Sequence, residues 1–539
     1  MNLKKNTTEN NNLFRIITGR KEGRNFSPLC TSRDLIFFCI VSVFSFGLIA
    51  HAYGFLNLGL SHDWLNAYIA TGVEDELKLS TGRFIVPLYR WLTRGDVATP
   101  WLLGLLGLCW TAAAAVLVVE LFRVRSKVCI ALIAGVMVTN ISYISQIASY
   151  HHEFDCNALS LLLSVAAVYF WERKRGFSSV FLGSVCILLS LGIYQAFFDV
   201  AVTLIIGLSL RDLLEKEDAK DVFLHGLSGI LLLLLGGGFY LLTEKLICLL
   251  TGLEFWDRTN IFSYAQKNTL HFCLYLLKEA LLFWLDKVNH PAYGSWILGA
   301  ALAILSLATL LTTAQYFLKN KFGTERFLLA LALLAALPFA MVCIFLGMRG
   351  ARVHDLMIYS VWFFYIFLLL LSWKNAQLHP IKCTKWIRNI TSVLVIWVLM
   401  QNVILSNMAY TKHSLEVQGT LSTMTRVVSD LENREDYVYA ETPLAFIGIY
   451  ESAEYPYEPL HVQEITGMEV DSALYTDSND PYYNTYATYF RYVMQYQIKN
   501  CEPEAWNALV DDPRVQAMPA YPQRGYIQMV DDILVVKMS

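Results

Sequence analysis

The sequence predicts an α-helical polytopic membrane protein that ends in a small α/β domain. Of its 539 residues, 55% are hydrophobic and only 16% are charged, and the mean hydropathy is +0.44. This composition is too apolar for an ordinary soluble protein. Apolar runs of membrane-spanning length recur through residues 34–406, and the composition becomes polar after that point. The net charge of −3 gives no reason to expect a nucleic-acid partner.

About 20 apolar residues are needed to cross the hydrocarbon core of a bilayer. Two of the runs found here are short and meet at Tyr194–Gln195 with almost no loop between them. Counting them, eleven spans are predicted, at 35–56, 99–122, 128–148, 156–172, 178–193, 196–211, 223–249, 294–317, 327–347, 355–373 and 386–406.

Lysine and arginine alternate between the loops, which predicts the orientation of the chain. The N-terminal tail, 1–33, is basic and is interpreted as an uncleaved cytoplasmic segment. The loops 149–155 and 194–195, predicted to lie outside, carry no lysine or arginine. Each loop predicted to lie on the cytoplasmic side carries several. These are Arg123, Arg125 and Lys127; Arg173, Lys174 and Arg175; Arg211, Lys216 and Lys220; Lys319, Lys321 and Arg326; and Lys374, Lys382, Lys385 and Arg388. An odd number of spans then places the C-terminus outside.

The segment 407–539 is predicted to be a small extracytoplasmic α/β domain. It holds 8 Lys+Arg against 20 Asp+Glu, a net charge of −12, whereas residues 1–406 hold 34 against 25, a net charge of +9. Strand-like runs occur at 436–443 and 525–538, the second with a turn at Asp531–Asp532. Helical spacing occurs at 413–433 and 486–499.

Polar and ionisable residues gather in the loops predicted to lie outside. The long loop 57–98 contains Asp63, and its apolar spacing at 64–79 and 84–94 predicts helices lying in the membrane interface. The triplet 74–76 within it is interpreted as a solvated face. The facing turns carry His151, His152, Glu153 and Asp155; Tyr194, Gln195 and Asp199; and Arg349, Arg352, His354 and Asp355. Ionisable groups beside membrane spans are costly unless they pair, face water or serve a function.

Five stretches together resemble a known family. They are SHDW (61–64), STGRFIVPLYRWL (80–92), YHHEFD (150–155), GIYQAFFDVAV (192–202) and YIQMVDDILVVK (526–537). The chain resembles the bacterial O-antigen-type glucosyltransferases of seroconversion clusters, which belong to the GT-C class of polytopic glycosyltransferases. The resemblance implies a polyprenyl-phosphate glucose donor and an acceptor glycan at the outer face of the bacterial cytoplasmic membrane. It also implies a catalytic carboxylate in the first outer loop, where Asp63 lies.

The residues fit such a reaction on chemical grounds as well. A sugar hydroxyl is a poor nucleophile, and a carboxylate such as Asp63 can take its proton as general base in an inverting transfer. The phosphate leaving group needs positive charge, which arginine supplies through bidentate contacts. The candidate phosphate-binding residues are Arg349 and Arg352, with Arg83 and Arg258 as alternates. The candidate sugar-binding residues are Trp64, His151, His152, Glu153, Asp155, Tyr194 and Gln195.

Each candidate has an alternative interpretation. Asp63 could cap the helix that follows it, and Arg349 and Arg352 could be interfacial anchors or ion-pair partners. The turn 151–155 holds metal-ligand residue types, so a divalent metal is an alternative there, although no cofactor is expected. The expected partners are the lipid-linked donor, the envelope glycan, the bilayer, a donor-synthesising glycosyltransferase and a flippase. A transporter or flippase of lipid-linked saccharides is the alternative function, and a non-catalytic accessory protein of envelope assembly is a third.

Overall fold

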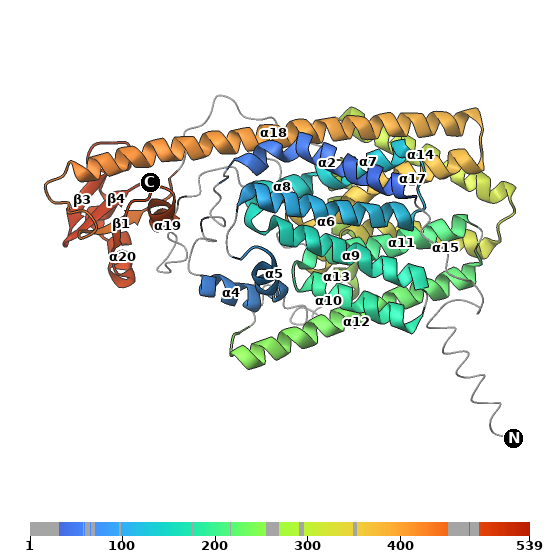
Figure 1. Ribbon diagram of the computed structural model, residues 1–539, viewed down its shortest axis with the longest axis horizontal. Coiled ribbons are helices and arrows are strands. Elements are labelled where there is room, and N and C mark those ends of the chain that lie inside the picture. Colours follow the sequence, from blue (N-terminus) through green and yellow to red (C-terminus); the bar gives the residue numbers. More distant parts are fainter. Residues whose placement is uncertain are drawn as a thin grey trace, which may run out of the picture.

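The computed structural model consists of a bundle of long helices, one of which projects from the bundle and carries a small β-sheet (Figure 1). The structure describes residues 32–57, 59, 65, 71–95, 99–174, 176–215, 217–254, 269–289, 296–348, 353–450, 474 and 485–539. Of the predicted N-terminal tail, only Ser32 and Arg33 fall within this part. Ser32 is the N-cap of the first described helix, and its hydroxyl accepts a hydrogen bond from the Leu35 N–H.

Within the described residues, nine helical segments are long and apolar enough to cross a membrane. Their elements are α2 (Arg33–Leu56), α6 (Pro100–Leu121), α7 with α8 (Lys127–Thr139, Ile141–Ser149), η1 with α9 (His151–Glu153, Phe154–Lys174), α12 (Ala219–Thr251), α14 (Trp296–Lys319), α15 (Thr324–Met341), η4 with α17 (Tyr359–Trp362, Phe363–Leu378) and α18 (Lys382–Glu432). The two short predicted spans correspond to α10 (Phe177–Leu191) and α11 (Phe198–Leu214), of 15 and 17 residues. The chain is thus mostly helical, with helices compatible with a polytopic membrane protein, and the count of eleven spans stays a prediction.

The helices α2, α6, α9, α10 and α12 form a row in which each packs on the next (Figure 1). Glycine makes the close crossing of α10 and α12 possible. A Cβ at Gly236 would lie 2.6 Å from the Cβ of Ile187, and a Cβ at Gly183 would overlap Leu232. Small residues at crossings let membrane helices approach closely, because packing between helices replaces the hydrophobic effect inside a bilayer.

One helix was not predicted. The segment between the predicted spans 223–249 and 294–317 contains α13 (Thr269–Asn289), which packs against α15 and the short α16 (Cys343–Gly347). Four charged residues, Lys278, Glu279, Asp286 and Lys287, interrupt its apolar pattern. One of these charged side chains, that of Lys287, is largely buried. It pairs with Asp355 at 3.0 Å, at the start of η3 (Asp355–Met357).

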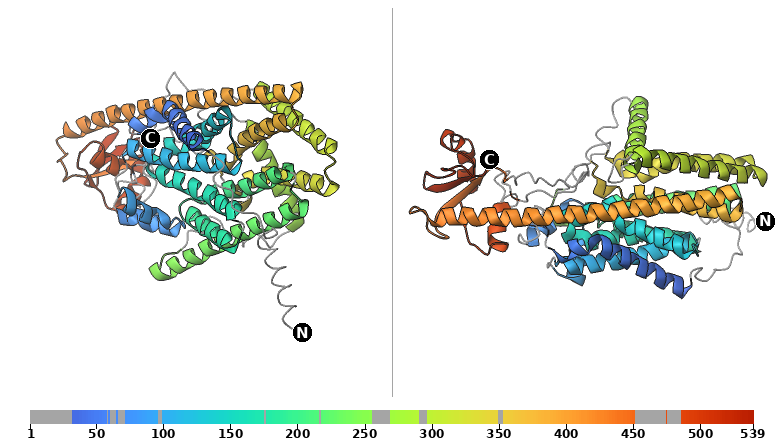
Figure 2. Two further views of the ribbon diagram at one scale, coloured as in Figure 1. Left: turned by 45° about the vertical axis from the view of Figure 1, so that its right-hand side comes forward. Right: turned by 90° about the horizontal axis from the view of Figure 1, so that it is seen from above.

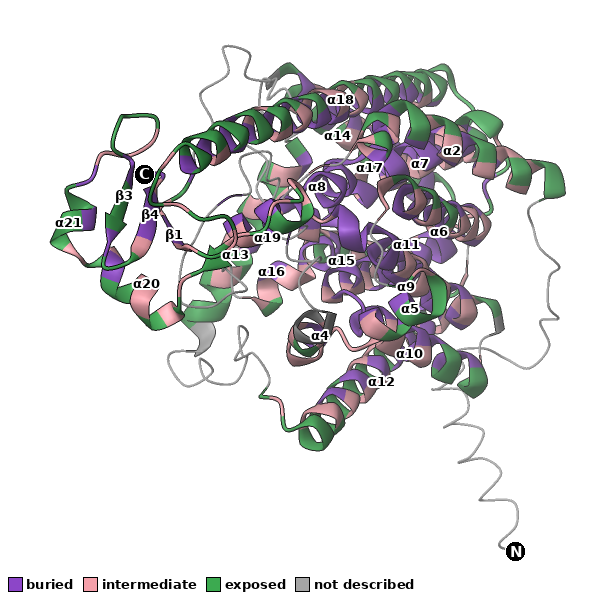
Figure 3. Ribbon diagram, turned by 60° about the vertical axis from the view of Figure 1, so that its left-hand side comes forward, coloured by how far each residue is buried: buried purple, intermediate pink, exposed green. Residues whose placement is uncertain are grey.

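The helix α18 runs for 51 residues and passes through the predicted boundary at 406–407 without a break. At about 1.5 Å per residue it is roughly 77 Å long, more than twice the hydrocarbon thickness. No proline occurs within it, and Pro380 lies just before it begins. Its projecting part keeps a buried stripe at helical spacing, including Tyr410, His413, Glu416, Thr420, Met424, Val427 and Leu431 (Figures 2 and 3).

The projecting end of α18 packs on a four-stranded sheet in the order β2-β1-β4-β3. The strands are β1 (Pro443–Ile447), β2 (Lys499–Asn500), β3 (Ile527–Val530) and β4 (Ile533–Lys537). The central β1 and β4 are parallel and apolar, with Leu444 and Phe446 facing α18 and Ala445 facing the opposite side. The first predicted strand is therefore wrong in position, because residues 436–442 form turns and the strand begins at Pro443.

The second predicted strand run is a β-hairpin, as expected from its sequence. Asp531 and Asp532 both have positive φ, 49° and 61°, and form the two-residue turn between β3 and β4. The predicted helix at 486–499 is shorter in the structure, because α19 (Thr485–Tyr492) ends before β2 begins. Its Tyr486, Tyr489 and Phe490 are buried in the core between sheet and α18, with the short helices α20 (Pro503–Val510) and α21 (Pro513–Gln516) on the other face.

Candidate functional site

The predicted interfacial loop forms two short helices, α4 (Thr71–Ser80) and α5 (Ile85–Thr93). They lie at the end of the helical bundle toward which α18 projects (Figure 1). A salt bridge joins them, because Arg90 on α5 pairs with Asp75 on α4. Asp75 thus holds the two helices together and is not only a solvated carboxylate, whereas Glu76 is exposed as expected.

A tight turn between α4 and α5 is held against η2 (Gln195–Phe197) and α12. The Gln195 amide donates hydrogen bonds to the Thr81 carbonyl and to the Tyr240 hydroxyl, both at 3.0 Å. Gly82 has φ +75°, and a Cβ at this position would overlap the Tyr240 hydroxyl. Only glycine therefore fits this turn without strain. The turn therefore fixes the backbone position of the next residue, Arg83.

Glu153 lies at the centre of a charged cluster. It is 2% exposed in η1, pairs with Lys78 from α4, and accepts a hydrogen bond from Arg83 at 3.3 Å. The Arg83 guanidinium also lies over the Tyr194 ring, 5.0 Å from its centroid. The side chain of Arg83 remains 25% exposed. The cluster therefore combines two cations, one buried carboxylate and an aromatic ring, with Arg83 at its open side.

Tyr194 contributes a buried hydroxyl to this cluster. Its side chain oxygen has no hydrogen-bond partner among the described residues. Burial raises the pKa of this phenol, and the charge of Arg83 offsets part of the increase. The hydroxyl is therefore protonated at neutral pH and can donate a hydrogen bond. An unsatisfied buried hydroxyl is costly, and a sugar or phosphate oxygen would satisfy it.

Asp155 is held by a second, separate ion pair. Arg94 donates to it from Nε at 2.8 Å and also donates to the His152 carbonyl at 2.6 Å. Burial acts to lower the pKa of Arg94, but the charge and hydrogen bond of Asp155, together with Cys156 and Tyr89, outweigh it, and the net shift is upward. Both side chains are almost fully buried, so this pair fastens the end of α5 to the start of α9. Asp155 is thus buried in an ion pair, and its contact with a sugar stays a prediction.

The two histidines of the same turn are core residues. His151 packs between the rings of Phe55 and Phe154, and His152 lies beside Tyr150. Among the described residues, no group of three or more His, Cys, Asp or Glu side chains could hold a metal ion. The four polar residues at 151–155 therefore do not converge on one point, and the metal alternative has no geometric support there.

The structure brings together Arg83, Glu153, Tyr194 and Gln195, four of the residues predicted to bind the phosphate or the sugar. The predicted Asp63, Trp64, Arg258, Arg349 and Arg352 lie outside the described residues. Lys78 and Tyr240 belong to the site but were not predicted. Lys78 resembles any lysine on an amphipathic helix, and nothing local in the sequence signals a partner 75 residues away.

A large cavity lies deeper in the bundle, between α11, α14, α15 and α17. Its volume is about 740 Å³, within the range typical of ligand pockets. Most of its lining is apolar, including Leu302, Leu334 and Phe367. On α14 it extends from Gly299 to Phe317, which at 1.5 Å per residue is about 27 Å, close to the hydrocarbon thickness. The cavity therefore has the length and polarity of a lipid chain.

Comparison with known proteins identifies the family. The glucosyl transferase GtrII family matches residues 52–371, which are 320 of the 539 residues and more than half of the chain. The chain belongs to the glucosyl transferase GtrII family. No curated protein and no solved structure matches it. The match confirms the resemblance to the O-antigen seroconversion glucosyltransferases.

The GtrII match begins in α2 and ends in α17, so it includes the whole Glu153 cluster and most of the cavity lining. The lining residues Trp373, Lys374 and Gln377 lie just beyond it. It excludes α18 and the C-terminal sheet. The GtrII family name indicates that the chain is a glucosyltransferase that acts on glycans.

Proposed function

We propose that this glucosyltransferase transfers glucose from a polyprenyl-phosphate donor to a cell-envelope glycan such as O-antigen. The proposed location is the outer face of the bacterial cytoplasmic membrane. The Glu153 cluster is the observation that carries this proposal. Two cations, Lys78 and Arg83, meet at one carboxylate there, and the partly exposed guanidinium of Arg83 suits a phosphate held at the end of a membrane bundle.

Arg83 is the best-supported of the four candidate phosphate-binding arginines. Its guanidinium is partly exposed, fixed by Glu153 and the Tyr194 ring, and able to offer two parallel N–H donors. A donor phosphate at this position would meet Arg83, with the Tyr194 hydroxyl as a further donor. Arg349, Arg352 and Arg258 remain additional candidates.

In the proposed reaction, an acceptor hydroxyl oxygen attacks the anomeric carbon of the donor. The bond from that carbon to the phosphate oxygen breaks, and its electron pair leaves on the polyprenyl phosphate. The hydroxyl proton passes to the Asp63 carboxylate, acting as general base. A single displacement of this kind inverts the configuration at the anomeric carbon. The leaving phosphate needs positive charge and hydrogen bonds rather than a strong general acid.

Two described residues of the same loop as Asp63, Gly59 and Leu65, contact α18. A Cβ added at Gly59 would lie 2.9 Å from the His413 ring, and Leu65 is fully buried in the core that includes Met424 and Val427. Both contacts lead to the projecting part of α18, which carries the C-terminal sheet. We therefore propose that the sheet shapes the acceptor side of the site. A donor-synthesising glycosyltransferase and a flippase would supply the lipid-linked sugar.

The test uses the purified full-length protein with polyprenyl-phosphate glucose or a glucose nucleotide as donor, and candidate envelope glycans as acceptors. We expect transfer from the lipid-linked donor only. Asp63→Asn should lower kcat by at least about a hundredfold, the contribution of a general base. Arg83→Gln should instead raise KM for the donor. Glu76→Gln, an exposed carboxylate in the same loop, is the matched control and should leave both constants unchanged.

Equal transfer by wild type and Asp63→Asn would show that Asp63 is not the base. Transfer from the glucose nucleotide would refute the lipid-linked donor. If neither donor is used, and the protein moves a lipid-linked saccharide across vesicle membranes, the alternative of a transporter or flippase is correct.

A further inference from the structure

The cavity between α11, α14, α15 and α17 has one distinctly basic end. Arg123 and Arg125 from the α6–α7 turn and Lys374 from α17 line it there, together with the carboxylate of Glu215. At the opposite end the lining comes from the end of α13 and the start of α14, including Trp284 and Gly299. The charges thus lie at one membrane face, which the proposed topology places in the cytoplasm.

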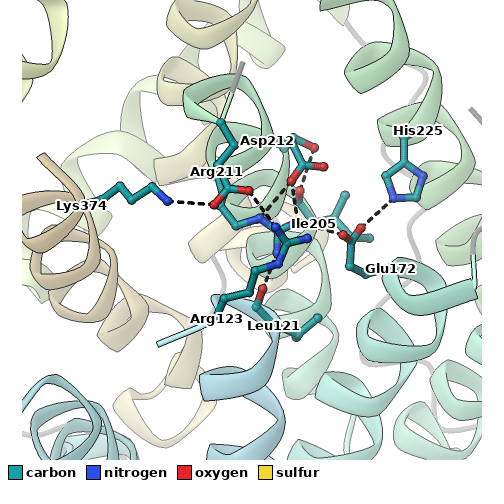
Figure 4. Close-up of polar contacts among 10 residues, drawn as sticks. Leu121, Arg123, Glu172, Ile205, Arg211, Asp212, His225 and Lys374 are labelled. Atoms are coloured by element: carbon teal, nitrogen blue, oxygen red, sulfur yellow. Dashed lines mark hydrogen bonds and ion pairs between the residues drawn. The ribbon is translucent and has the colours of Figure 1, made fainter. Parts of the chain in front are cut away.

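The neighbouring buried charges do not cancel this basic end. Arg211 pairs within the bundle with two carboxylates, Glu172 and Asp212, and Glu172 also contacts His225 (Figure 4). One guanidinium against two carboxylates leaves one negative charge, which offsets only part of the positive charge at the mouth. Figure 4 shows Lys374 and His225 on opposite sides of Arg211. At the mouth of the cavity, three cations face one carboxylate, an excess of two positive charges.

Glu215 bridges two of these cations and leaves them with further hydrogen-bond donors. It accepts from Arg123 at 2.8 Å and from Lys374 at 2.9 Å. Arg123 remains 45% exposed and Arg125 is exposed. Arginine presents five N–H donors in a planar fork, so one carboxylate contact leaves donors that can reach a second anion.

The apolar walls indicate that this anion carries a hydrocarbon chain. The consecutive helices α14 and α15 pack mainly on different partners, α14 on α17 and α15 on α11, so the cavity lies between two helix pairs. Basic pockets between membrane helices at the cytoplasmic face bind anionic lipid headgroups. We propose that the basic end is a binding site for the phosphate headgroup of an anionic phospholipid, with an acyl chain in the cavity. This inference depends on the proposed function only for the choice of leaflet.

The experiment measures lipid retention by native mass spectrometry of the purified full-length protein. The protein is offered phosphatidylglycerol and phosphatidylethanolamine in equal amounts, and polyprenyl phosphate in a separate arm. Wild type should retain phosphatidylglycerol preferentially. The double variant Arg123→Gln/Arg125→Gln should bind phosphatidylglycerol roughly thirtyfold more weakly than wild type, which is the effect of removing two cations near a membrane surface. Glu215 keeps its contact with Lys374, so folding should not depend on these arginines.

Two further variants separate the site from general surface charge. Lys321→Gln/Arg326→Gln removes two cations from the same face outside the cavity lining, and it should leave phosphatidylglycerol retention unchanged. Ala303→Phe narrows the cavity while keeping every charge, and it should reduce retention.

The proposal is overturned if the two phospholipids bind equally well, if the control pair weakens binding as much as the arginine pair, or if Ala303→Phe has no effect. If polyprenyl phosphate binds more tightly than phosphatidylglycerol, and its binding depends on Arg123 and Arg125 in the same way, the basic end of the cavity is a site for the carrier lipid and not for a phospholipid. No glucosyl transfer is measured, so failure here leaves the proposed function standing.

Discussion

At the scale of single residues, Glu153 holds the site together because it is the anion that compensates two cations. Glu153→Gln would remove the carboxylate that pairs with both Lys78 and Arg83, and Lys78 is almost fully buried. Breaking a buried ion pair typically costs about 3–5 kcal/mol. We expect the loss here to reach the lower part of that range, because Arg83 is partly exposed. Thermal unfolding in detergent would measure it.

The double variant Lys78→Met/Glu153→Gln provides the control, because it removes one buried cation together with the carboxylate. It should regain part of the lost stability. A Glu153→Gln protein as stable as wild type would contradict the central position that the structure gives this carboxylate.

Gly82 offers a second test at a single residue. Gly82→Ala combines a left-handed backbone conformation with a clash against the Tyr240 hydroxyl. Gly95 is the matched control, with φ +63° and nothing within 4 Å of an added Cβ. Gly95→Ala should cost about 1–2 kcal/mol from backbone strain alone, and Gly82→Ala should cost more. Adding Tyr240→Phe to Gly82→Ala should bring its unfolding temperature closer to that of Gly95→Ala, and no such recovery would locate the strain elsewhere.

At the scale of elements, the sequence predicted most helices because their apolar runs are long. The sequence-based prediction missed a helix where charged residues interrupt the apolar pattern and tertiary contacts compensate for them. The charges of α13 concealed a helix, and one of them, Lys287, is stabilised by Asp355, which lies 68 residues further along the chain. In the site, Glu153, Tyr194 and Gln195 were predictable because polar residues at turns between spans stand out. Lys78 was not, since only the fold shows that it faces Glu153.

The continuity of α18 is the element-scale property that no composition rule predicted. Leu421→Pro, at an exposed position beyond the bundle, should break or kink the helix at a cost of about 3 kcal/mol or more. Because α18 connects the sheet to the bundle, the variant should become cleavable by protease near residue 421 and should lose transfer if the sheet shapes the acceptor side. Leu421→Ala is the control and should remain intact. An uncleaved Leu421→Pro protein would show that other contacts fix the sheet.

The β3–β4 hairpin and α21 are joined by an exposed charge cluster that should respond to acid. Arg514 donates hydrogen bonds to Asp512 and Asp531, and these bonds hold the pKa of both carboxyls below the usual value. Groups with a lowered folded pKa add stability that is fully present above about pH 4 and is lost as the pH falls through the folded value. Hydrogen-exchange protection of β4 should therefore fall slightly at low pH, and less so in Asp531→Asn. An identical pH response in both proteins would rule out this contribution.

At the scale of the whole molecule, the long helix, the charge pattern and the site require one consistent orientation. Helices α4 and α5 lie at the end of the bundle toward which α18 projects with the sheet, and α18 begins at the other end (Figure 1). Lys78 on α4 and Arg83, just before α5, are the cations of the Glu153 cluster. A helix of roughly 77 Å that crosses a core of about 30 Å once must extend far into water on one side. The lysines at its start, Lys382 and Lys385, favour the cytoplasm for that end.

Two native cysteines test this orientation, because they mark opposite ends of the α18–sheet unit. Cys383 is exposed in the first turn of α18, and Cys501 is partly exposed beside β2. In variants that keep one of the two as their only cysteine, a membrane-impermeant thiol reagent added to cells with a permeabilised outer membrane should label Cys501 and not Cys383. After lysis both should react. Labelling of Cys383 alone before lysis would show that the topology is the reverse of the proposed one. The Glu153 cluster would then lie at the cytoplasmic face and the proposed phospholipid site at the outer face.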